Sequence, residues 1–165
     1  MQIGLQHGQA LRAHISRQLQ FYAEMFKLRC GLEWPQVLEV SKDFKATLSR
    51  LAPDLLEEMQ GIARGMDSPD TGVLDIIALN CRSEIALGKW TDGCTALGWN
   101  VPGQQRRQLL SQNWDWHRQM EDNLALMSIE KSGKPRIWMV TEVCQASSLS
   151  CWTWTHLVRL VLSAK

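Results

Sequence analysis

The sequence predicts an α+β fold in which N-terminal helices pack on an antiparallel sheet. Two observations lead to this prediction. Over residues 3–88, apolar residues recur close to the period of an amphipathic helix. After Lys89, short apolar stretches alternate with turn signals such as the Pro102-Gly103 pair, which is typical of strands joined by tight turns. Because the helices come first and the strands follow, the two kinds of element are expected to segregate.

The first helix is expected over residues 3–28. Its periodic apolar and small residues are Ile3, Ala10, Leu11, Ile15, Leu19, Tyr22, Met25 and Phe26. Gly4 and Gly8 lie one turn apart near its start. Glycines at this spacing let a helix approach a neighbour closely, although each costs about 1 kcal/mol of helix propensity relative to alanine. The pattern therefore predicts a close helix contact at this end of the chain.

Three more helical segments are predicted, over residues 35–50, 51–66 and 67–87. Pro35 suits the first turn of the first of them, because its missing N–H is not needed there. Gly65 is predicted to stop the second. The N-cap of the third is predicted to be Ser68, Asp70 or Thr71, and the pattern does not distinguish these three.

Two antiparallel strand pairs are expected in the second half. Residues 94–100 and 109–116 flank a predicted turn at 101–108, although Asn and Asp inside the second stretch are poor strand formers. Residues 124–130 and 136–142 flank the sequence KSGKP, which is a hairpin signal. The order of these stretches predicts an antiparallel meander.

Composition limits the classes of function. The 165 residues suit one domain, with 45% hydrophobic and 21% charged residues, as in ordinary globular proteins. The formal net charge of +1 argues against nucleic acid or an anionic membrane as a partner. The N-terminus has neither the basic nor the apolar region of a signal peptide, and no apolar window is long enough for a membrane span. An intracellular protein is expected, with cytoplasm and peroxisome left open.

The five cysteines are Cys30, Cys81, Cys94, Cys144 and Cys151. The number is odd and no C-x-x-C pair occurs, so neither a complete disulfide framework nor a zinc site is indicated. His7 and His14 lie seven residues apart, whereas paired metal ligands on a helix favour a closer spacing. No metal is therefore expected. Cys94 is the unusual cysteine, because it follows Gly93 at the predicted junction of helix and strand. It fits either a small buried side chain or a nucleophile.

Four stretches resemble one known family. They are IGLQHGQA (3–10), EEMQGIARGM with DIIALNCRSEI (57–66 and 75–85), DGCTALGW (92–99) and SQNWDW (111–116). Together, in this order, they resemble the acyl-coenzyme A:6-aminopenicillanic acid acyltransferases, also called isopenicillin N acyltransferases, over residues 3–142. The resemblance implies an N-terminal-nucleophile fold with two sheets between helical layers, of which this chain would carry a part and lack most of the second sheet.

The resemblance also implies a chemistry for Cys94. Members of the family cut their own backbone before a cysteine, and here the bond would be Gly93–Cys94. The released residue would carry a thiol and an α-amine together. Only the thiolate is a strong nucleophile, and an α-amine with a reference pKa of about 7.7–8.0 can accept the thiol proton near neutral pH. Glycine before the cysteine tolerates backbone strain that other residues resist.

By the same resemblance, Asp115 would orient the new amine, and Asn113 is an accessory candidate. The predicted strand pairing agrees with this, because the far ends of 94–100 and 109–116 meet and bring Cys94 towards Asp115. Implied substrates are small amides or thioesters, with acyl-coenzyme A as a co-substrate and no other cofactor. Trp114 and Trp116 are expected to pack on the sheet, and contact with an acyl group is the alternative.

The chain departs from the family at both ends. It begins almost on the IGLQHG motif, and residues 143–165 carry no family motif. We therefore expect a truncated acyltransferase-like domain over 1–142, divided into a helical segment 1–93 and a nucleophile-bearing segment 94–142, followed by a divergent tail. Catalytic activity of the chain alone is expected to be absent or nearly so. An exposed sheet face is expected to favour self-association.

Two alternatives to an enzyme remain. One is a non-catalytic fragment or interaction module derived from the same family, which the helix-rich residues 3–88 would support. The other is a gene-model product without a stable fold. Cleavage at Gly93–Cys94 distinguishes the enzyme from both.

Overall fold

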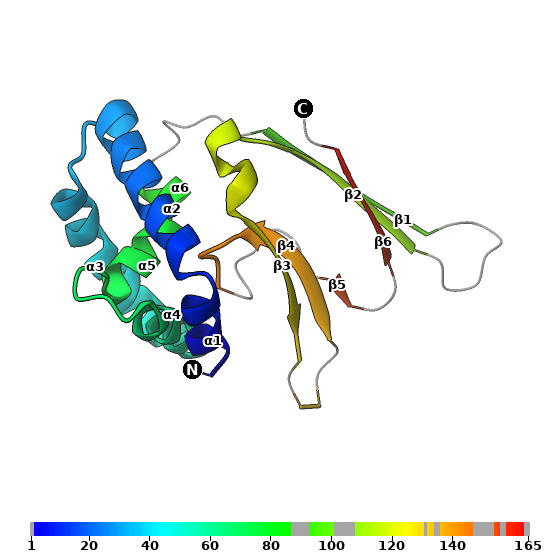
Figure 1. The fold of residues 1–165 in the computed structure, drawn as a ribbon, viewed down its shortest axis with the longest axis horizontal. Helices are drawn as coiled ribbons and strands as arrows, with labels where there is room; N and C mark the ends of the chain where they lie inside the picture. Colours follow the sequence, from blue (N-terminus) through cyan, green and yellow to red (C-terminus); the bar gives the residue numbers. More distant parts are fainter. Residues whose placement is uncertain are drawn as a thin grey trace.

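Helices occupy one side of the molecule and strands extend from the other (Figure 1). This computed structural model describes residues 2–86, 93–100, 108–130, 132–133, 136–146, 154–155 and 158–163. At Cys94, Trp114, Asp115 and several other strand positions it describes the backbone alone. The segregation of helices and strands confirms the α+β class, whereas the N-terminal-nucleophile fold stays a prediction.

The predicted first helix is present in three pieces. They are α1 (Gln2–Ala10), α2 (Arg12–Met25) and a π-helical turn, η1 (Phe26–Cys30). The chain leaves η1 through Gly31, whose φ of 68° is left-handed and costs glycine nothing. Ile15, Tyr22 and Phe26 are fully buried on the inner face. The helical periodicity of this segment therefore identified the buried face.

The close helix contact predicted from Gly4 and Gly8 is confirmed. Both glycines pack against α4 (Pro53–Met66), and both are buried. A Cβ added at Gly4 would lie 2.0 Å from the Glu58 carbonyl oxygen, and one at Gly8 would lie 2.2 Å from that of Ile62. Only a hydrogen atom fits between the two backbones.

The predicted role of Gly65 is wrong. Helix α4 continues to Met66 and ends at Asp67, which takes the left-handed conformation itself with a φ of 48°. Gly65 instead faces α1, where an added Cβ would lie 2.4 Å from the Leu5 carbonyl oxygen. A glycine near a helix end can serve a close contact as well as a stop, and the local sequence does not separate the two.

The other helices agree with the sequence in position. Helix α3 (Trp34–Leu51) has Pro35 in its first turn and a capping box between Glu33 and Gln36. The predicted segment 67–87 contains α5 (Val73–Asn80) and α6 (Arg82–Ile85), separated at Cys81. None of the three predicted N-caps of α5 is used. Gly72 precedes the helix, and its N–H donates to the Asp75 carboxylate at 2.8 Å.

Both predicted strand pairs are present. β1 (Gly93–Asn100) pairs antiparallel with β2 (Gln108–Asp115), and β3 (Leu124–Ile129) pairs antiparallel with β4 (Ile137–Glu142). Of the predicted turn at 101–108, residues 101–107 lie outside the described residues, and Gln108 already belongs to β2. A 3₁₀ helix, η2 (Arg118–Asn123), connects β2 to β3.

The described strands form two three-stranded sheets in place of a single meander. β5 (Trp154–Thr155) extends the β3–β4 pair, and β6 (Val158–Ser163) runs parallel to β2. Both strands come from the segment 143–165, which carries no family motif and in which the sequence predicted no strand. A parallel partner contributed from so far along the chain leaves no local turn signal.

The main core lies within the helical layer and continues into the residues that follow β4. Val143, Cys144 and Ala146 are buried with the helices, as is Met120 of η2. No helix in the described part of the chain is long and apolar enough to cross a membrane. The end of β4 is thus the place where the strand half of the chain enters the helical core.

Gly8→Ala is expected to lower the free energy of unfolding by about 1–3 kcal/mol, because the added methyl overlaps backbone atoms of α4 and forces the helices apart. Chemical denaturation of the purified chain measures this. Gly72→Ala is the matched control, since its Cβ would meet nothing closer than 3.7 Å. Equal losses in the two variants would contradict the packing argument.

Candidate active site at the end of the β1–β2 ladder

The predicted site residues meet at one end of the β1–β2 ladder. Gly93 pairs directly with Asp115, Cys94 with Trp114, and Thr95 with Asn113. The backbone of the Gly93–Cys94 bond therefore lies across from the Trp114–Asp115 bond. Asn113 is exposed, and the side chains of Cys94 and Asp115 lie outside the description. The expected pairing is present, and Gly93 is the residue directly opposite Asp115.

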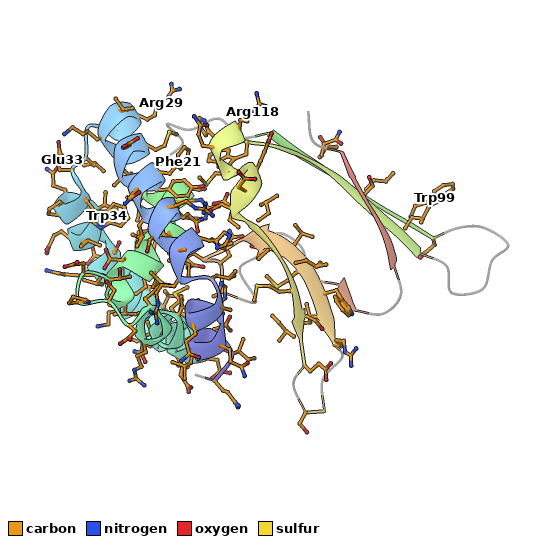
Figure 2. All side chains as sticks on the ribbon, in the orientation of Figure 1. Phe21, Arg29, Glu33, Trp34, Trp99 and Arg118 are labelled. Atoms are coloured by element: carbon orange, nitrogen blue, oxygen red, sulfur yellow. The ribbon has the colours of Figure 1, made fainter. Side chains whose placement is uncertain are left out.

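Directly after this ladder end, the chain contacts the helices. Trp116 is half-buried, and its indole N–H donates to the Tyr22 hydroxyl of α2 at 3.1 Å. His117 packs edge-on against Phe21 of the same helix, with ring centroids 5.4 Å apart. Figure 2 shows Phe21 on this helix, whereas Trp99 lies far out on the strands. The ladder end with Gly93 and Asp115 is thus the end joined to the helical layer.

A buried carboxylate lies behind the Tyr22 hydroxyl. Glu142, at the end of β4, is 2% exposed. Its Oε2 accepts hydrogen bonds from the Gln18 amide at 2.6 Å and from the Tyr22 hydroxyl at 2.8 Å. Its Oε1 accepts from the Arg82 guanidinium at 3.1 Å. Every partner lies on a helix, so the carboxylate joins the strands to α2 and α6.

Arg82 is held on several sides. Its side chain is 13% exposed and donates to the Leu79 carbonyl oxygen at 2.7 Å. Its guanidinium carbon lies 5.1 Å from the centroid of the Tyr22 ring, in cation–π geometry. Burial acts most strongly to lower the pKa of Arg82, but the negative charge of Glu142 and smaller contributions from neighbouring groups together outweigh it, and the pKa is raised overall. Glu142 therefore faces a permanent cation.

Tyr22 acts as a donor and an acceptor at once. Burial raises the pKa of Tyr22; the Arg82 charge opposes this, and the Glu142 charge adds to it. The phenol stays protonated at physiological pH, so its hydrogen is directed to Glu142 and its oxygen is available to Trp116. These four residues, Tyr22, Arg82, Trp116 and Glu142, are called the anchor cluster below.

The segment after β4 has its own polar contacts. The Val143 carbonyl oxygen lies 2.6 Å from His7 Nε2, which therefore carries the proton of the ring. Asn80 donates to the Cys144 carbonyl oxygen at 2.9 Å and accepts from the Ala146 N–H at 2.9 Å. Burial lowers the pKa of His7, although its contact with Val143 and the Glu58 charge oppose this. His7 is a neutral structural residue.

Two of the described thiols are poorly suited to nucleophilic chemistry. Burial raises the pKa of Cys81 to about 11 and raises that of Cys144 further. Both therefore stay protonated near neutral pH. Cys30 is half-buried. Within the described part of the chain, no group of three or more His, Cys, Asp or Glu is placed to hold a metal ion.

Sequence reasoning missed the anchor cluster. Tyr22 was assigned to the apolar face of the first helix, and Trp116 to sheet packing. Arg82 and Glu142 were assigned no role. One sequence signal could have pointed to the cluster. Gln18, Tyr22 and Glu142 place hydrogen-bonding groups inside otherwise apolar patterns, and such groups need partners when they are buried.

No protein-family model matches the chain. Over 143 residues, 86% of its length, the chain is 29% identical to the acyl-coenzyme A:6-aminopenicillanic-acid-acyltransferase 40 kDa form of Emericella nidulans. The chain spans 38% of the length of that relative. The match supports a distant relationship to the isopenicillin N acyltransferases.

Removing the Glu142 carboxylate by Glu142→Met is expected to lower the free energy of unfolding by about 3–5 kcal/mol, because Arg82 is left as an uncompensated buried charge. The double variant Arg82→Met/Glu142→Met is expected to lose less than the sum of the two single variants. Denaturant titration measures all three.

The control for this cycle is Glu39→Met. Glu39 pairs with Lys42, both side chains are largely exposed, and the cost is expected to stay below about 1 kcal/mol. Strict additivity of Arg82→Met and Glu142→Met would show that the two side chains do not depend on each other.

Proposed function

We propose that the chain carries the self-cleaving, cysteine-nucleophile part of an acyltransferase or amidohydrolase with an N-terminal-nucleophile fold. The observation that carries the proposal is the ladder register, which sets the Gly93–Cys94 bond across from Asp115. The acyltransferase named in the comparison supports the reaction class. The whole enzyme would act on small amides or thioesters, with acyl-coenzyme A as an acyl donor.

Self-cleavage would use the Cys94 thiol, the Gly93–Cys94 peptide bond and one water molecule. The Cys94 sulfur, as it loses its proton, attacks the Gly93 carbonyl carbon. The carbon–nitrogen bond then breaks, and the Cys94 nitrogen takes up a proton. Water hydrolyses the resulting thioester, which leaves a carboxylate on Gly93 and restores the thiol beside a free α-amine.

The new α-amine makes the second reaction accessible. In its neutral form it accepts the thiol proton, and the thiolate attacks the carbonyl of an amide or thioester substrate. The amine or thiol of the substrate leaves, and the acyl group is held on Cys94 until an amine or water takes it. In the proposal Asp115 orients the α-amine, and Asn113 is an accessory donor.

Intact-mass measurement of the purified 165-residue chain tests the proposal. Cleavage is expected to give pieces of residues 1–93 and 94–165, with one water added across the pair. Cys94→Ala is expected to stay uncut, because it lacks the attacking sulfur. Cys30→Ala, which changes a half-buried thiol on η1, is expected to be cut like the unaltered chain. An uncut unaltered chain after prolonged incubation would refute the proposal.

A second candidate function, an interaction module, is favoured by one face of the β3–β4 pair. Leu126 and Trp138 share that face, because Leu126 pairs with Val140 and Ser128 with Trp138. They are 68% and 47% exposed, while Ile129 and Met139 on the other face are buried. An antiparallel pair with one solvated face normally presents polar residues there. The apolar outer face suits a second copy of this chain.

Leu126→Lys tests that candidate. The unaltered chain is expected to increase in average mass with concentration in light scattering. The variant is expected to stay monomeric over the same range, because a lysine disfavours burial of the face. Leu28→Lys is the matched control, since Leu28 is 79% exposed on η1, away from these strands. Association that survives Leu126→Lys would exclude this face.

A further inference from the structure

The end of β2 is tied to the helices through a short, continuous path. Asp115 is the last residue of β2, and Trp116 follows it directly. The Trp116 indole donates to the Tyr22 hydroxyl at 3.1 Å, and that hydroxyl donates to Glu142 at 2.8 Å. The Asp115–Trp116 peptide bond and two hydrogen bonds thus connect Asp115 to the buried carboxylate of Glu142.

The middle member of this path has little freedom. The Tyr22 side chain is fully buried. Its ring packs edge-on against Phe21, with centroids 5.1 Å apart, and Arg82 lies over it at 5.1 Å. Glu142 also accepts hydrogen bonds from Gln18 and Arg82, so its carboxylate holds the Tyr22 hydroxyl in a fixed position. The Trp116 indole therefore donates to a hydroxyl that does not move. The anchor cluster is therefore a rigid reference point for the strand end.

Through its strand pairing, the β1–β2 ladder also restrains the Gly93–Cys94 bond. Gly93 is the direct partner of Asp115, and Cys94 that of Trp114. A displacement of the β2 end therefore displaces the Gly93 carbonyl relative to its neighbours. Attack on a carbonyl is sensitive to such displacements, because the reacting atoms must lie about 3–3.5 Å apart in alignment.

We propose that Tyr22 and Trp116 are positioning residues for the Gly93–Cys94 bond: their hydrogen bond fixes the end of β2 on the Glu142 carboxylate, and the β1–β2 ladder transmits this position to Gly93. The inference rests on the proposed self-cleavage. It assigns no chemical step to either residue, because both act through the backbone of the ladder.

The test compares two tryptophans. Trp116→Phe removes the indole donor to Tyr22. Trp34→Phe is the matched control, because the Trp34 indole also donates from a part-buried position, to the Asp75 carboxylate at 2.8 Å, without contacting β2. Both variants are expected to melt at a lower temperature than the unaltered chain, and Trp34→Phe by at least as much, because its lost hydrogen bond is to a carboxylate. Only Trp116→Phe is expected to slow cleavage, by about 2- to 10-fold, the factor that one hydrogen bond provides.

Two further readouts separate positioning from general loss of stability. Hydrogen exchange of residues 108–117 is expected to become faster in Trp116→Phe and in Tyr22→Phe, and to stay unchanged in Trp34→Phe. The double variant Tyr22→Phe/Trp116→Phe is expected to cleave no more slowly than the slower single variant, because both substitutions remove the same hydrogen bond.

The outcomes distinguish this inference from the proposed function. An unaltered chain that stays uncut refutes self-cleavage, and the positioning role is refuted with it. An unaltered chain that cleaves, with Trp116→Phe and Trp34→Phe cleaving at the same rate, refutes positioning alone. Unchanged exchange of residues 108–117 in both Tyr22→Phe and Trp116→Phe also refutes positioning.

Discussion

The Glu142 carboxylate is the group on which the arrangement of helices and strands depends. A carboxylate with 2% of its surface exposed loses most of its hydration, and only charge-assisted hydrogen bonds offset that loss. Gln18, Tyr22 and Arg82 supply them from two different helices. Because the three donors converge on this one carboxylate, they fix the position of the end of β4 against the helical layer.

The helical layer can act as a fixed base because its own packing is unusually close. Gly4, Gly8 and Gly65 bring the backbones of α1 and α4 into direct contact, where no side chain fits. Helices in such contact cannot slide without overlap, so their own packing fixes their relative position. The strand half joins this base through Trp116 after β2, through Asn123 at the end of η2, and through Glu142 to Ala146 at and after the end of β4.

In this arrangement, the residues singled out by the resemblance to an acyltransferase lie where the strands join the helices. The end of the β1–β2 ladder that carries Gly93 and Asp115 is the end nearest the anchor cluster, while Trp99, near the Asn100–Gln108 end of the ladder, lies far from the helices (Figure 2). The apolar outer face of β3–β4 is a separate feature of the strand half. The apolar face bears on the proposed association of two copies, whereas the ladder end bears on the proposed cleavage of the Gly93–Cys94 bond.

Up to Glu142, the sequence by itself determined the main helical and strand segments, their order and their local pairing. Helical periodicity located the buried face of α2, the glycine spacing predicted the contact of α1 with α4, and the turn signals predicted the β1–β2 and β3–β4 pairs. It also singled out Cys94 and Asp115, through motifs and strand ends that lie close along the chain. What these features share is a local cause, a period or a turn that a few neighbouring residues specify.

Only the tertiary structure decided how distant segments use their polar groups and backbone. The bond from Tyr22 to Glu142 spans 120 residues, and that from Trp116 to Tyr22 spans 94. No local pattern records such partners, so Tyr22 looked apolar and Gly65 looked like a helix stop. The parallel pairing of β6 with β2 has the same origin. Periodicity tells which side of an element is buried, and tertiary contacts alone tell what is buried against it.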